Sequence, residues 1–133
     1  MSCLQIDFST SIPIYLQIID EFKRLIATGT LRPGDKISSQ RDLATELKVN
    51  ANTVQRAYRE MEMLGLVETL RGQGTFVCQD QGIVEGTRSE MLANLVDDFV
   101  RAMQALGLSE EATLEVVKTR FQGVQAQKGV SEQ

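Results

Sequence analysis

Apolar residues recur every three or four positions along two stretches near the start of the chain, which is the spacing of a helix that buries one face. The first stretch begins after Pro13, a residue suited to the first turn of a helix, and ends at Gly29. The second begins after Ser39, and Asp42 three residues later completes the pattern of a capping box. The pattern therefore predicts two amphipathic helices joined by a turn.

A third helix and a hairpin follow. Asn50 is a candidate N-cap for a helix with one apolar side, and Gly65 supplies its C-terminal stop. Residues 66–78 then hold two short β-prone runs on either side of the Arg-Gly-Gln-Gly turn at 71–74. The order helix, turn, helix, turn, helix, hairpin predicts an α+β winged helix-turn-helix domain over residues 1–79.

The rest of the chain predicts an all-α module with uncovered apolar faces. Residues 80–86 carry two glycines and little periodicity, so we expect a linker there. Two helices are expected within 87–127, the first capped by Thr87 and the second by Ser109, and residues 128–133 are expected to form a flexible tail. Two helices alone cannot bury such wide faces, so we predict that they are a dimerisation module and that the protein is a homodimer. The positions expected in that interface are Leu92, Leu95, Val96, Phe99, Met103, Leu106, Leu114, Val117, Phe121 and Val124.

The charge pattern contains a basic segment within an acidic chain. The 133 residues hold 14 Lys and Arg against 18 Asp and Glu, a formal net charge of −4. Residues 1–79 are balanced, so the whole negative excess lies beyond them. The segment from Lys36 to Arg59 contains more cations than acidic residues. Because phosphate is attracted by a local patch and not by the average, this segment is a candidate DNA-binding surface, with a solvated helix face as the alternative.

The residue inventory argues against an enzyme. The chain has no histidine, which excludes catalytic triads and histidine metal sites, and it shows no metal-ligand spacing. We therefore expect no catalytic activity, no metal and no cofactor. Cys3 and Cys78 form neither a disulfide framework nor a zinc cluster, so reduced thiols in a cytoplasmic protein are expected. No apolar run approaches the ~18 residues of a membrane helix and no signal-peptide pattern opens the chain, so no membrane association is expected.

Five blocks of sequence follow one another in order: Leu31 to Ile37, Ser39 to Ala44, Val49 to Tyr58, Leu64 to Val67, and Gly72 to Val77. Together they resemble the GntR family of bacterial transcription regulators. The resemblance implies a winged helix-turn-helix that binds a double-stranded DNA operator. Most of the family continues into a large effector-binding domain, whereas the short remainder here, together with the stretch that starts at Asn50, resembles the YtrA-like subfamily.

Candidate DNA-binding residues lie along the predicted third helix, which the winged fold places in the major groove. Asn52 and Gln55 carry amides that donate and accept at once, which suits the edge of adenine. Thr53 and Arg56 suit phosphate oxygens, and Arg56 also suits a base acceptor. Ala51 could contact a thymine methyl group, but it stands where many family members carry arginine or proline, so the family's base preferences do not transfer to this chain. The alternative for Asn52 and Gln55 is ordinary exposed helix polarity, and the alternative for Thr53 is a local cap.

Further candidates flank this helix. Asn50 and Ser39 are candidate contacts whose alternative role is helix capping alone. Arg41 resembles the family's arginine early in the second helix, which contacts phosphate or a base. In the hairpin, a cation could reach the minor groove, although the glycines are needed for the turn in any case. The hairpin candidates are Arg71, Gly72 and Gln73.

These observations leave two function classes and one question of regulation. The first function is a dimeric repressor on a pseudo-palindromic operator. The alternative is a winged-helix protein-interaction module without DNA readout, favoured by the acidic total and the apolar C-terminal helices. A small-molecule effector of unknown identity could bind between the C-terminal helices; the residues considered for its lining, which could equally be plain dimer core, are Met91, Phe99, Met103 and Phe121.

Overall fold

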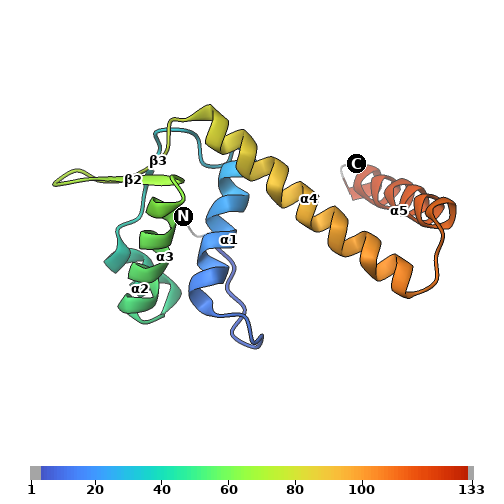
Figure 1. Ribbon diagram of the computed structural model, residues 1–133, viewed down its shortest axis with the longest axis horizontal. Coiled ribbons are helices and arrows are strands. Elements are labelled where there is room, and N and C mark those ends of the chain that lie inside the picture. Colours follow the sequence, from blue (N-terminus) through green and yellow to red (C-terminus); the bar gives the residue numbers. More distant parts are fainter. Residues whose placement is uncertain (1–3, 132–133) are drawn as a thin grey trace. The chain divides into compact units, whose positions relative to one another are not determined.

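The computed structural model of the protein describes residues 4–131, with side-chain surroundings up to Val124. The chain divides into two compact units between Leu92 and Ala93. The elements, labelled in Figure 1, are α1 (Ile14–Ala27), β1 (Lys36–Ile37), α2 (Gln40–Leu47), α3 (Ala51–Met63), β2 (Val67–Leu70), β3 (Gly74–Val77), α4 (Gln81–Ala105) and α5 (Glu110–Ser131). The predicted fold class, an α+β winged helix-turn-helix followed by an all-α region, is confirmed.

The caps predicted for the second and third helices form as expected. The hydroxyl of Ser39 accepts a hydrogen bond from the backbone N–H of Asp42 at 3.1 Å and starts α2. The side-chain oxygen of Asn50 accepts from the backbone N–H of Asn52 at 2.7 Å and starts α3. Each bond satisfies an N–H group that has no partner within the helix, so the chain leaves each turn at a defined residue.

The core of the N-terminal unit lies between α1, α2 and α3. Tyr58 of α3 and Phe22 of α1 are fully buried, and their rings meet edge to face with centroids 5.9 Å apart. The hydroxyl of Tyr58 donates a 2.6 Å hydrogen bond to the backbone carbonyl of Ser38, so this buried polar group is satisfied. Around this pair are further buried residues from every element of the unit, among them Ile18, Ile26, Ile37, Leu43, Val54, Met61, Leu66 and Val77.

The predicted hairpin is present and forms part of a three-stranded antiparallel sheet in the order β1-β3-β2. The strand β1 was not predicted, because two residues carry no periodicity. Val77 of β3 pairs with Val67 of β2, and Thr75 pairs with Ile37 of β1. All four of these side chains are buried. The free end of the hairpin extends away from the three helices (Figure 1) and forms a wing.

The predicted linker over 80–86 is wrong, because α4 already begins at Gln81. The side chain of Asp80 accepts a hydrogen bond from the backbone N–H of Gly82 at 2.8 Å, the usual action of an N-cap. Val84 is buried in the core of the N-terminal unit, so the first turns of the helix are held by packing despite their two glycines.

The C-terminal boundaries differ from the prediction in two further ways. Thr87, the predicted cap, is a buried residue inside α4. The predicted start of α5 is confirmed, since the hydroxyl of Ser109 accepts from the backbone N–H of Ala112 at 3.2 Å. The predicted tail is wrong for 128–131, because α5 continues to Ser131, and residues 132–133 lie outside the described residues. Alanine, glutamine and lysine are good helix formers, and no proline stops the helix there.

Replacing Tyr58 by phenylalanine should lower the free energy of unfolding by about 1–2 kcal/mol, because the half-buried carbonyl of Ser38 loses its hydrogen-bond donor. Burial first, and then the negative charge of Glu46, raise the pKa of Tyr58 above its usual value. A raised pKa in the folded state gives stability that is complete below the pKa of the unfolded chain, near 10, and declines as the pH rises above it. Urea unfolding at neutral pH and at about pH 10.5 should therefore show a smaller loss in Tyr58→Phe than in the wild type.

Tyr15→Phe is the matched control for this substitution. It removes a hydroxyl that has no hydrogen bond among the described residues, so stability at neutral pH should not change. Equal stability of Tyr58→Phe and the wild type would contradict the structural role given to the Tyr58 hydroxyl.

Candidate DNA-binding surface

Opposite its buried side, α3 presents a continuous row of exposed polar residues. Asn52, Gln55, Arg56 and Arg59 follow the i, i+3, i+4, i+7 spacing of one helix face, and all four are exposed. The buried residues of the same helix are on its other side and fix its rotation about its axis. The predicted candidates Asn52, Gln55 and Arg56 are thus brought together. Arg59 was missed, although its spacing and the basic segment could have revealed it.

The residues at the start of α3 differ in role and in exposure to solvent. The side-chain oxygen of Asn50 serves as the N-cap, which confirms the capping role and leaves its amide nitrogen without a described hydrogen bond. Ala51 is exposed at the first position of the helix. Thr53 is half-buried. The N-terminal end of α3 therefore offers a small apolar group beside polar ones.

In α2 the candidate cation is exposed at the N-terminal end. Ser39 is exposed, and its oxygen accepts the capping bond while its O–H remains able to donate. Arg41, two residues further, is exposed, and no hydrogen bond to its side chain occurs in the part of the chain that the structure describes. The hydroxyl of Thr45 donates to the backbone carbonyl of Arg41 within the helix.

The wing carries its candidates at its tip. Arg71, Gly72 and Gln73 are all exposed in the turn between β2 and β3. Gly72 has φ +78, a left-handed backbone conformation that favours glycine, and the N–H of Gln73 donates to the carbonyl of Leu70 at 2.9 Å. A tight turn thus places one cation at the end of the hairpin.

A second cation lies beside the wing and was not predicted as a site residue. Lys36 of β1 is exposed and pairs with Phe76 of β3. A methyl group on Gly74 would lie only 2.7 Å from Cε of Lys36, so the missing side chain of Gly74 lets the lysine cross the hairpin. Lys36 belongs to the basic segment seen in the sequence, but only the pairing of β1 with β3 brings it to the wing.

Arg56 has an aromatic neighbour. Its guanidinium carbon lies 3.8 Å from the centre of the Tyr15 ring, which comes from α1. This contact joins residues 41 positions apart, so no local pattern predicts it.

The cations of this surface have no acidic partners among residues 4–131. The ion pairs found there are Arg24 with Glu21, both in α1, and Arg101 with Asp98, both in α4, so neither includes a cation of α2, α3 or the wing. Exposed cations without a bound carboxylate are available to phosphate, and their attraction for it weakens as salt is added.

The described residues contain no cluster of potential metal ligands, no membrane-spanning helix and no reactive thiol. No group of three or more potential metal ligands occurs among them, and no described helix has the length and apolarity needed to cross a bilayer. Cys78 is buried, and burial raises the pKa of its thiol, which disfavours the reactive thiolate. Cys3 lies outside the described residues.

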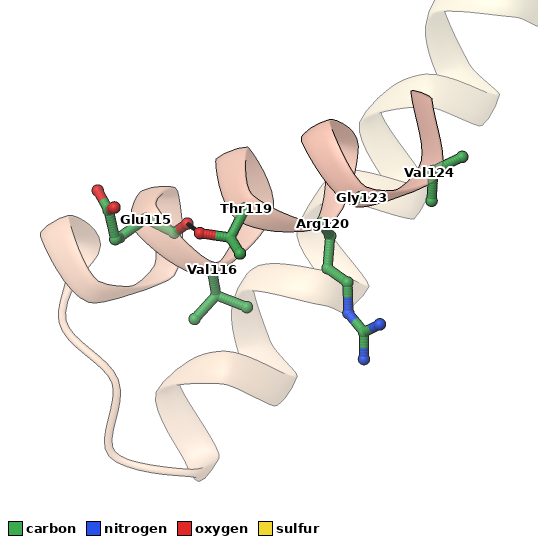
Figure 2. Close-up of a pocket in the computed structure, with 6 residues that line it drawn as sticks. All are labelled: Glu115, Val116, Thr119, Arg120, Gly123 and Val124. Carbon is green, nitrogen blue, oxygen red and sulfur yellow. Dashed lines mark hydrogen bonds between the residues drawn. The ribbon is translucent and has the colours of Figure 1, made fainter. Parts of the chain in front are cut away.

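The predicted interface residues of the C-terminal helices are open to solvent. Met103 and Val117 are half-buried, and the others, from Leu92 to Val124, are exposed. A hollow of about 340 Å³ in the C-terminal unit is lined by Phe99 and Phe121, together with Val116, Val117 and Arg120. It contains two of the four residues considered for an effector, while Met91 and Met103 are not among its lining residues. Figure 2 shows a neighbouring hollow along α5, lined by Glu115, Val116, Thr119, Arg120, Gly123 and Val124.

Three helices, a projecting hairpin and an exposed row of amides and cations on the third helix define a winged helix-turn-helix DNA-binding protein. The chain belongs to the GntR family: residues 14–77 match the family described as bacterial regulatory proteins, gntR family. It is a DNA-binding transcription regulator of that family, as the sequence predicted.

Relatives of similar length support this assignment over most of the chain. The HTH-type transcriptional regulator YhcF of Bacillus subtilis is 46% identical, over 87% of this chain and 96% of its own. The transcriptional repressor YtrA of the same organism is 45% identical, over 71% and 77%. A solved GntR family transcriptional regulator from Listeria monocytogenes is 38% identical, with a TM-score of 0.80 over 84% of this chain and 98% of its own. Because the family and these relatives are transcription regulators, the expectation that the protein is not an enzyme is confirmed, and so is the resemblance to the YtrA-like subfamily.

Proposed function

We propose that this protein is a homodimeric repressor that binds a pseudo-palindromic DNA operator in the cytoplasm. The observation that carries the proposal is the exposed row of amides and cations on α3, whose opposite side is buried in the core. Repression as the direction of regulation is supported by the similarity to YtrA of Bacillus subtilis, which is named a transcriptional repressor.

Base reading is assigned to the amides near the start of α3. Asn52 and Gln55 each offer a donor and an acceptor, which match the N6 and N7 groups that adenine presents in the major groove. Ala51 is small enough to meet a thymine methyl group and has no donor for guanine. We therefore expect A·T pairs beneath the N-terminal half of α3.

Phosphate contact is assigned to the cations and hydroxyls around the amides. Arg41 lies near the N-terminus of α2, Lys36 lies beside Gly74 of the wing, and Arg71 lies at the tip of the wing. Ser39 still has an O–H to donate. These contacts position the protein on the duplex and carry most of its salt dependence, while Arg71 at the wing tip is suited to the minor groove.

Dimerisation is assigned to the apolar stripe of α4 and α5. Leu95 is 68% exposed and Leu106 is 72% exposed in the single chain, and Phe121 is 64% exposed. Large apolar side chains exposed in this number are unfavourable in water unless a partner covers them. A second copy covers the same stripe by two-fold symmetry and presents two copies of α3 to half-sites about one helical turn apart, or a multiple of it.

Alanine variants separate base reading from phosphate contact. Asn52→Ala and Gln55→Ala should each weaken operator binding by about 1–3 kcal/mol and relax the preference at one base position. Arg41→Ala and Lys36→Ala should weaken binding to all sequences alike and reduce the slope of log K against log salt by about 1. Fluorescence anisotropy with the DNA upstream of the protein's own and neighbouring genes, over a series of salt concentrations, measures both effects.

Arg101→Ala is the control of equal charge change, because Arg101 lies on the polar side of α4 and not on the proposed surface. It should bind DNA like the wild type. A wild-type protein without any salt-sensitive preference among DNA sequences would contradict the proposal. If charge reversal on α3 then abolished binding to a partner protein, the function would be a protein-interaction module instead.

The dimer is tested by one charge on the apolar stripe. Leu95→Asp should convert the protein to a monomer in sedimentation equilibrium, because a buried unpaired carboxylate opposes association. Binding to a full operator should fall towards that of a half-site. Asn94→Asp introduces the same group at the adjacent, exposed position and should remain dimeric. A dimeric Leu95→Asp, or a monomeric wild type at the concentrations that bind DNA, would remove this part of the proposal.

Release by a small effector is proposed for the hollow between Phe99 and Phe121. Its walls are entirely apolar, because Arg120 lines it only with the apolar part of its side chain, which suits an uncharged apolar ligand. A thermal-shift screen of uncharged aromatic compounds should find a compound that stabilises the wild type and weakens DNA binding, but stabilises Val117→Ala less. No stabilisation by any compound would favour the alternative, in which these residues are plain dimer core.

A further inference from the structure

A residue outside the helix-turn-helix holds one of the cations of the proposed DNA surface. The guanidinium carbon of Arg56 lies 3.8 Å from the centre of the Tyr15 ring, within the range of a cation–π contact. We infer that Tyr15 is a positioning residue, which orients the guanidinium of Arg56 towards a bidentate acceptor on DNA. This inference rests on the proposed function.

The ring of Tyr15 is anchored on its own side. Tyr15 is the second residue of α1 and is half-buried against the core. The helix α1 packs on α3, and Ile18 and Ile19, just beyond Tyr15, are buried in the core. The aromatic platform is therefore part of the core packing, whereas the side chain of Arg56 is exposed.

The N–H donors of Arg56 remain available beside the ring. A guanidinium group carries five N–H donors, and no side-chain hydrogen bond of Arg56 occurs among the described residues. No carboxylate in the described part of the chain forms an ion pair with Arg56. Restricting a long side chain before binding reduces the conformational entropy lost when it meets its ligand. The geometry thus favours a flat acceptor with two oxygens or an oxygen and a nitrogen, which phosphate and the O6/N7 edge of guanine both provide.

A double-mutant cycle on operator binding tests this role. Tyr15→Leu should weaken binding by about 2- to 5-fold, the size of an exposed cation–π contact, while Tyr15→Phe keeps the ring and should bind like the wild type. In an Arg56→Ala background, Tyr15→Leu should have no further effect. Arg56→Lys should not restore binding, because an ammonium group lacks the planar fork.

The same measurements distinguish a phosphate acceptor from a guanine acceptor, and they distinguish failure of this inference from failure of the proposed function. A phosphate partner predicts that Arg56→Ala lowers the salt slope by about 1 for every sequence, and a guanine partner predicts relaxed preference at one base pair. If Tyr15→Leu weakens binding equally with and without Arg56, or not at all, the positioning role is wrong while the proposed function stands. If Arg56→Ala binds DNA as tightly as the wild type does, the positioning role is also wrong, while the proposed function stands. If the wild type has no specific DNA binding, both fall.

Discussion

The packing of α3 against α1 through Tyr58 and Phe22 is the contact on which the proposed function depends. A helix with one side buried has no freedom to rotate, so burying Val54, Tyr58 and Met61 also determines that Asn52 and Gln55 face outwards. The Tyr58 hydroxyl adds a directional bond to the loop before α2, which relates the two helices of the helix-turn-helix to each other. The orientation of the candidate DNA-binding residues is therefore determined by core packing and not by contacts among those residues themselves.

The two units of the chain solve the problem of apolar surface differently. The N-terminal unit closes its core within one chain, with helices, sheet and the first turns of α4 all contributing buried residues. In the C-terminal unit, the apolar side chains of two helices stay exposed. In our proposal a second copy covers this apolar surface. The C-terminal unit is then stable only in the dimer, and the dimer always contains two copies of α3.

Most of the N-terminal fold could be predicted because its signals are local. Ser39 and Asn50 cap helices through bonds that span two or three residues, and the hairpin turn has its own residue types. The start of α4 was missed because two glycines concealed the cap at Asp80, whose support comes from distant core packing. The stacking of Arg56 on Tyr15 and the crossing of Lys36 over Gly74 depend on tertiary neighbours, which no sequence window contains.

The central claim is that two copies of α3 read two symmetric half-sites. Hydroxyl-radical footprinting of the purified protein on DNA upstream of its own gene tests it most directly. The account predicts two protected segments related by a two-fold axis, centred about 10 base pairs or a multiple apart, both of which disappear in Asn52→Ala at concentrations that protect the wild type. A single protected segment, or symmetric protection that Asn52→Ala leaves unchanged, would contradict it.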